Sequence, residues 1–154
     1  MRLSEIFEAG GVIVAPPWRS FEEAVRGMVG RLIASGQVDA AVQDQAVRAV
    51  CEREAMCSTT MVEIGIGVPH ARLRGISGLV SALATSPTAV YLETAGVPIR
   101  IMVLVLSAPE LAAQHLQFLA KVSMLLQSEM VRQSLLEASD SSAVLAFLRA
   151  REGA

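Results

Sequence analysis

Two histidines are the residues of this 154-residue chain with the clearest capacity for chemistry. His70 follows Pro69 in the segment Gly67-Val-Pro-His-Ala-Arg72, and the proline fixes φ and removes a backbone donor just before the histidine. Imidazole has an unperturbed pKa of about 6.5, so at neutral pH it can serve as a nucleophile or as a proton carrier. A histidine beside a turn is also a common surface or structural residue, so the hexapeptide alone leaves both interpretations open.

Arg53 and His115 are further candidates, because helical spacing places each on an apolar face. Arg53 lies one turn after Val50, where a guanidinium suits phosphate oxygens but also serves as an ordinary cap for the last carbonyls of a helix. His115 lies one turn from Leu111 and one turn from Leu119, on the buried stripe of its helix. A buried imidazole needs a hydrogen-bond partner, whether its role is catalytic or structural.

The elements that position these residues alternate between helices and strands. Ser20 with Glu23 forms a capping box, which predicts that a helix begins there and ends near Ser35. Ser107 is interpreted in the same way, as the cap of a helix with Pro109 in its first turn. The remaining predicted elements are helices over about 39–53, 129–138 and 141–150 and strands over 79–84, 89–92 and 97–106.

The last of these strands is apolar almost without interruption. Such a run is typical of a central strand covered by helices on both faces. The length and the apolar content of 53% fit one domain over residues 1–154, of the α/β class.

Composition also excludes several classes of function. A net charge of −2 and scattered arginines provide no electrostatic surface for nucleic acid. The longest strongly apolar run, 101–106, is too short to span a membrane, and the N-terminus lacks a secretory signal, so we expect a cytoplasmic protein. Cys51 and Cys57 match neither zinc-ligand nor redox spacing, so we expect no metal, no disulfide and no cofactor.

Four segments together carry a resemblance to a known family: Arg53-Glu54, Ser58-Thr59, Gly65 to Arg72, and His115 to Ala120. In their order and spacing they resemble enzyme IIA of the phosphotransferase system, fructose/mannitol class. The resemblance covers nearly the whole chain and is greatest to the nitrogen-regulatory type. It implies a single domain with a mixed β-sheet flanked by helices and with the histidine-bearing segment at the edge of the sheet.

The resemblance also implies roles for individual residues. His70 is expected to be the phosphoryl acceptor, His115 the second active-site histidine, and Arg53 the basic residue near the phosphate. From their residue types, Ser58 and Thr59 are expected to line a cavity for the phosphoryl group. Arg72 is expected to help the phosphate of the partner arrive, with a solvated surface arginine as the equal alternative.

Two departures from the family pattern concern the segment before His70. The loop Thr60 to Ile64 is one residue longer than usual, and Gly67-Val68 replaces a small residue followed by isoleucine. If Glu63 projected into the phosphate cavity, its charge would oppose phosphate binding.

The resemblance implies that phosphate arrives on His70 from a phosphohistidine carrier, either HPr or its nitrogen-branch relative. We expect a regulatory role, in which phosphorylation changes the affinity for target proteins. One alternative is a sugar-specific enzyme IIA that passes phosphate to a transporter enzyme IIB. The other is a protein-binding module that keeps the fold without the reaction.

Overall fold

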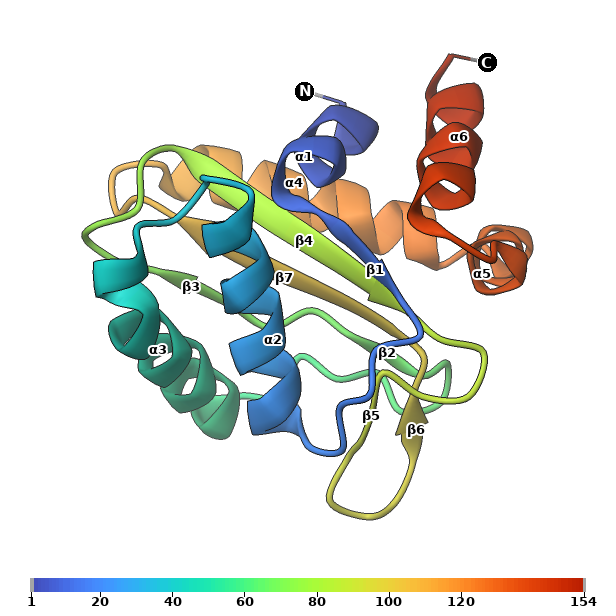
Figure 1. Cartoon of the computed structure of the whole chain (residues 1–154), viewed down its shortest axis with the longest axis horizontal. Coiled ribbons are helices and arrows are strands. Elements are labelled where there is room, and N and C mark those ends of the chain that lie inside the picture. The colour runs from blue at the N-terminus through green and yellow to red at the C-terminus, as the bar shows by residue number, and fades with distance from the viewer. Residues whose placement is uncertain (1, 154) are drawn as a thin grey trace.

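A computed structural model describes residues 2–153, in which a mixed five-stranded sheet lies between two groups of helices (Figure 1). This architecture confirms the predicted α/β fold with a mixed sheet. The elements, in chain order, are α1 (Leu3–Gly10), β1 (Val12–Val14), α2 (Phe21–Ala34), the 3-10 helix η1 (Ala40–Val42), α3 (Gln43–Met56), β2 (Ile66–Gly67), β3 (His70–Arg72), β4 (Leu79–Thr85), β5 (Tyr91–Leu92), β6 (Pro98–Ile99), β7 (Ile101–Ser107), α4 (Ala112–Leu126), α5 (Glu129–Glu137) and α6 (Ser141–Glu152).

The sheet has β7 at its centre and β3 at an edge. Its order is β1-β4-β7-β2, and β3 pairs with β7 further along the same side as β2. Strands β1 and β4 are parallel, β4 and β7 are antiparallel from Leu79↔Ser107 to Thr85↔Ile101, and β7 is parallel to both β2 and β3. The expected position of the histidine-bearing segment at the sheet edge is therefore confirmed.

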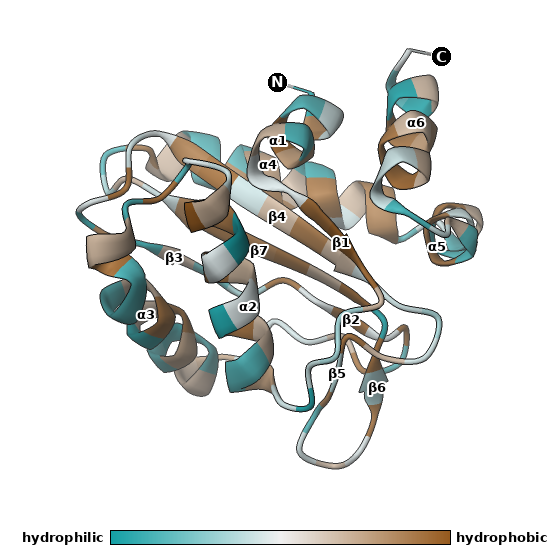
Figure 2. Cartoon of the chain, viewed as in Figure 1, coloured by the Kyte–Doolittle hydropathy of each residue, from teal (hydrophilic) through white to brown (hydrophobic). Residues whose placement is uncertain are grey.

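Both faces of β7 are buried, as its apolar sequence predicts. The colouring of Figure 2 shows the hydrophobic character of this strand. Met102, Leu104 and Leu106 belong to a core cluster that includes residues of α2 and α3. Residues at the alternate positions, Val103 among them, belong to a second cluster formed with α1, α4, α5 and α6. Because side chains alternate across a strand, one continuous apolar run builds both cores.

The helix boundaries follow the predicted capping in some places. Ser20 Oγ accepts a hydrogen bond from Glu23 N at 3.2 Å, which confirms the start of α2. The predicted helix over 39–53 divides into η1 and α3, with the Asp39 side chain capping η1 through Ala41 N. Helices α5 and α6 lie where they were predicted.

Three boundaries were wrong. Ser107 ends β7 and does not cap α4, whose N-cap is Leu111. The predicted strand over 97–106 is interrupted at Arg100, whose carbonyl accepts from Ser86 N at 2.9 Å outside the sheet. The predicted strand over 89–92 is reduced to β5, which forms a two-stranded hairpin with β6. Within residues 2–153, no helix has both the length and the apolar character needed to cross a membrane.

Candidate functional site

The edge strand β3 presents two candidate residues on one face. His70 lies opposite Val105 of β7, and Arg72 lies opposite Ser107. Ala71, between them, points to the opposite face and packs into the core below α2 and α3. No further strand pairs with the outer edge of β3 in the described residues, and a cavity at this edge, between α3 and α4, is lined by His70 and Arg72.

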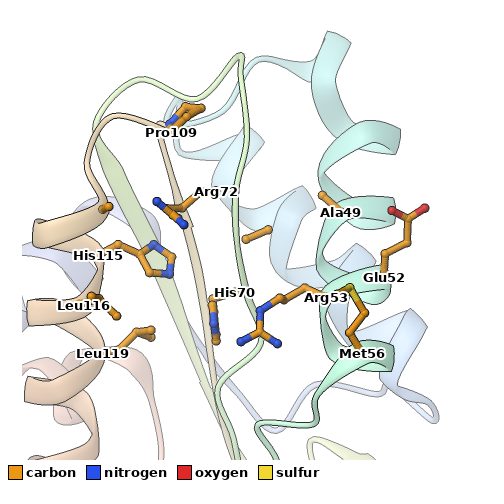
Figure 3. A pocket seen from close by; sticks show the side chains of 12 residues that line it. Ala49, Glu52, Arg53, Met56, His70, Arg72, Pro109, His115, Leu116 and Leu119 are labelled. Atoms are coloured by element: carbon orange, nitrogen blue, oxygen red, sulfur yellow. The ribbon is translucent and has the colours of Figure 1, made fainter.

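Two helices bring two further candidates, His115 and Arg53, to the same place. His115 lies in the first turns of α4 and Arg53 in the last turn of α3, and all four side chains line one cavity of about 630 Å³. In Figure 3 the His115 ring points from α4 toward His70, Arg72 lies beside it, and Arg53 reaches in from α3 on the other side of the edge strand. The two imidazole rings have centroids 5.2 Å apart and are tilted by 60°.

The tautomer of His70 follows from its backbone partner. Its Nδ1 lies 2.9 Å from the carbonyl oxygen of Val68. A carbonyl can only accept a hydrogen bond, so Nδ1 carries the proton and donates it. In the neutral ring this leaves Nε2 with a free lone pair, which is the form of imidazole that attacks an electrophile.

His115 is far more enclosed, with 4% of its surface exposed. Its Nδ1 lies 2.6 Å from Ser107 Oγ, which is itself fully buried. Burial, with smaller contributions from positive charge on His70, Arg72 and Arg53, lowers the pKa of His115 to about 4. At neutral pH the site therefore contains a neutral His115.

The two guanidinium groups give the cavity an anion-binding character. In the part of the chain that the structure describes, neither Arg53 nor Arg72 forms an ion pair with a carboxylate. Arg53 donates from one guanidinium nitrogen to the carbonyl of Cys57 at 3.2 Å, so it caps the helix and lines the cavity at the same time. Glu52 is exposed, and its carboxylate points away from His70 in Figure 3.

Ser58 and Thr59 are not brought into this cavity. Both hydroxyls bond to the Glu54 carboxylate, Ser58 Oγ at 3.1 Å and Thr59 Oγ1 at 2.8 Å, and Thr59 N donates to the same carboxylate at 2.7 Å. Ser58 lines a separate cavity between α3 and the β5–β6 hairpin. These residues therefore hold the loop after α3 to the helix, and the structure places them outside the cavity that His70 lines.

Glu63 also lies away from the histidines. It is exposed and lines a third cavity together with Arg100 and α5, so its charge is not directed at His70. Both cysteines are free thiols, and no group of three or more His, Cys, Asp or Glu residues within 2–153 is arranged to hold a metal ion.

Ser107 is the residue of this site that sequence reasoning missed. Its Ser-Ala-Pro-Glu context matches the start of a helix, and the local pattern gave no indication that β7 continues through it. The available signal was a single small polar residue at the end of a strand that is otherwise apolar.

The low pKa of His115 predicts a loss of stability in mild acid. The folded pKa of about 4 lies below the unfolded value of 6.5, so folding favours the neutral ring. The stability linked to this ring is complete above pH 6.5 and is lost progressively as the pH falls toward 4. The measurement is urea unfolding of wild type and His115→Asn across this range. As the pH falls from 6.5 to 4, the free energy of unfolding of the wild type should decrease more than that of His115→Asn.

The matched control for this measurement is His70→Asn, which keeps His115. Because the charge of a protonated His70 is one of the causes that lower the pKa of His115, we expect this variant to keep the sign of the wild-type pH dependence between pH 6.5 and 4 but to show a smaller change. Equal pH dependence in wild type and His115→Asn would show that the fold does not hold His115 neutral.

Comparisons with known proteins identify relatives in sequence and in fold. The fructose-specific EIIA component of the phosphotransferase system from Haloferax volcanii is 32% identical over 124 residues, which are 80% of this chain and 79% of the relative. The nitrogen regulatory protein IIA-Ntr of Neisseria meningitidis has the same fold, with a TM-score of 0.75, 19% identity, and coverage of 95% of this chain and 98% of the other.

A structure of the mannitol enzyme IIA of Escherichia coli, in complex with phosphorylated mannitol enzyme IIB, is also similar. Its TM-score is 0.72 at 20% identity, with 93% of this chain and 96% of that chain covered. The family model that matches residues 5–151 is described as phosphoenolpyruvate-dependent sugar phosphotransferase system, EIIA 2. A match over almost the whole chain shows that this protein belongs to the EIIA 2 family of the sugar phosphotransferase system.

Proposed function

We propose that this protein is a phosphoryl carrier, in which Nε2 of His70 accepts a phosphoryl group from a phosphohistidine of HPr or its nitrogen-branch relative. The observation that carries the proposal is the bond from His70 Nδ1 to the Val68 carbonyl. This bond leaves Nε2 unprotonated, and the ring borders a cavity that contains two guanidinium groups. Membership of the EIIA family supports the same reaction.

The transfer needs no proton movement at His70. Its Nε2 lone pair forms the new N–P bond while the N–P bond of the donor phosphohistidine breaks. The electron pair of the broken bond returns to the donor imidazole. Nδ1–H of His70 stays on the Val68 carbonyl throughout, and the exchange of one phosphoramidate for another makes the step readily reversible.

The side chains of Arg53, Arg72 and His115 position the phosphoryl group and stabilise its negative charge. Phosphoryl transfer depends mainly on alignment and on neutralising the oxygens of the moving group. Arg53 and Arg72 enter the cavity on opposite sides of His70 and supply donors to those oxygens (Figure 3). His115 lies close enough, at 5.2 Å between ring centroids, to donate a hydrogen bond to an oxygen of a phosphoryl group on His70.

We further propose that the phosphoryl group passes onward to an enzyme IIB of a sugar transporter. The support is the 32% identity to a fructose-specific EIIA component. The regulatory role expected from the sequence has weaker support, because the likeness to IIA-Ntr is one of fold at 19% identity. Regulation therefore enters as the competing outcome of the experiment below.

The experiment incubates the purified chain with phosphoenolpyruvate, enzyme I and either HPr or its nitrogen-branch relative, and follows intact mass. We expect the mass of one phosphoryl group to be added. A chase with unphosphorylated fructose-type and mannitol-type IIB domains should then remove this group from the chain and place it on IIB.

The other outcomes separate the alternatives. An adduct that forms but passes to neither IIB would contradict the transport role and support regulation. No adduct with either carrier would overturn the carrier proposal and support a protein-binding module with this fold.

A further inference from the structure

The contact between Ser107 and His115 links the end of the central strand to the site. Ser107 is paired on both sides, with Arg72 of β3 and with Leu79 of β4, so its backbone is fixed by two strands. Its Oγ lies 2.6 Å from His115 Nδ1, and both side chains are buried. A hydrogen bond this short between two enclosed groups leaves the ring little freedom to rotate.

The direction of this hydrogen bond follows because the buried hydroxyl hydrogen of Ser107 requires an acceptor. In the described part of the chain, Ser107 Oγ has His115 Nδ1 as its hydrogen-bond partner and no other. If Nδ1–H were the donor, the serine O–H would be buried without an acceptor, which costs about 1–3 kcal/mol. If the serine donates, both groups are satisfied. Nδ1 is then the unprotonated nitrogen, and Nε2 carries the proton.

We infer that Ser107 is a positioning residue, which holds His115 in the Nε2–H tautomer and directs that N–H toward a phosphoryl group on His70. The inference rests on the proposed function, since it specifies how the second histidine of that site takes part. Ser107 itself does not touch the phosphate and acts through His115.

The two histidines are thereby held in opposite tautomers by opposite kinds of partner. The Val68 carbonyl accepts from Nδ1 of His70 and leaves its Nε2 as a nucleophile. The Ser107 hydroxyl donates to Nδ1 of His115 and leaves its Nε2 as a donor. One ring can therefore form the bond to phosphorus while the other binds an oxygen of the same group, without any proton exchange between them.

The surroundings of His115 preserve this state. Burial favours the neutral imidazole, and so does the repulsion that a charge on this ring would meet from Arg72, from Arg53 and from a protonated His70. A protonated ring would carry a hydrogen on Nδ1 and could no longer accept from Ser107. The arrangement thus depends on a neutral His115.

The test reads the tautomer directly by long-range ¹⁵N–¹H NMR of the imidazole nitrogens at pH 7. In the wild type we expect an unprotonated Nδ1 and a protonated Nε2 for His115, and the reverse for His70. In Ser107→Ala the His115 signals should shift toward a mixture of tautomers, and transfer of phosphate to His70 should slow about tenfold. Ser107→Thr, which keeps the hydroxyl, should restore both.

The matched control is Ser81→Ala. Ser81 is an equally buried serine on β4, but its Oγ donates to the Leu104 carbonyl at 2.8 Å. Its removal deletes a comparable hydrogen bond without touching His115, so the NMR signals of the ring should stay as in the wild type. Thermal melts of the three variants separate the loss of the tautomer from a general loss of fold.

Two results would overturn the inference. One is a protonated Nδ1 of His115 in the wild type. The other is a Ser107→Ala protein with wild-type tautomer or wild-type transfer rate. Because the tautomer is read on the unphosphorylated protein, it decides the role of Ser107 in holding the ring even if no carrier phosphorylates the chain, a result that would contradict only the proposed function.

Discussion

His70→Asn should abolish phosphoryl uptake, lowering its rate by at least about 10⁴-fold, because removal of a covalent nucleophile leaves only binding. Asparagine is the informative replacement. Its side-chain amide can still donate to the Val68 carbonyl in place of Nδ1, whereas nothing replaces Nε2. The variant should therefore fold like the wild type and differ in the one atom that we assign to the reaction.

The measurement is intact mass after incubation with phosphoenolpyruvate, enzyme I and the carrier, with thermal melting as the test of fold. NMR of the phosphorylated wild type should locate phosphorus on Nε2 of His70. A phosphoryl adduct on His70→Asn would show that another residue is the acceptor. Phosphorus on Nδ1 of the wild type would show that the bond to Val68 does not set the nucleophile.

Helical periodicity predicted more of the site than the short motif around His70 did. The spacing of Arg53 after Val50 placed its guanidinium on the apolar side of α3, and the structure shows this side chain at the cavity wall. His115 was likewise predicted on a buried stripe and is 4% exposed. These features could be predicted because they depend on neighbours within one helix.

The structure departs from the expected arrangement where another partner, distant or near in sequence, binds the residue. Ser107 has a sequence typical of a helix cap, but pairing with β3 and β4 on both sides extends β7 through it. Ser58 and Thr59 were expected near the phosphate, but their hydroxyls bond to the carboxylate of Glu54, which precedes them by four and five residues. The local sequence pattern does not predict which of several competing partners will bind a residue in the folded protein.

The meeting of the two histidines has a different origin. They are 45 positions apart in the chain (115 minus 70), and His70 lies on a strand whereas His115 lies on a helix. Neither the two-residue period of a strand nor the 3.6-residue period of a helix can therefore predict that they meet. Family resemblance supplied that expectation. The physical cause is the parallel pairing of β3 with β7, since the chain leaves the end of β7 directly into the helix that carries His115.

Arg53→Gln should slow phosphoryl transfer about 10²-fold while leaving the phosphorylated residue unchanged. A preorganised donor aimed at developing charge has an effect of this size when it acts in an enclosed site. Arg53 fits that description, because it has no carboxylate partner in the described residues and its position is fixed by the bond to the Cys57 carbonyl. Arg53→Lys should lose less, since it keeps the charge but not the planar pair of donors.

The control for Arg53 lies on the same helix. Arg48 is exposed and does not line the cavity, so Arg48→Gln removes the same charge from α3 without removing a donor near His70. If the effect of Arg53 were only general attraction of an anionic partner, both variants would slow transfer alike, and salt would remove the difference from wild type. Quenched-flow measurement of transfer from the phosphorylated carrier, at low and high salt, distinguishes the two. If the Arg53 guanidinium contacts the moving phosphoryl group, Arg53→Gln alone should slow transfer, and the defect should persist at high salt. An equal defect in Arg48→Gln would contradict that role.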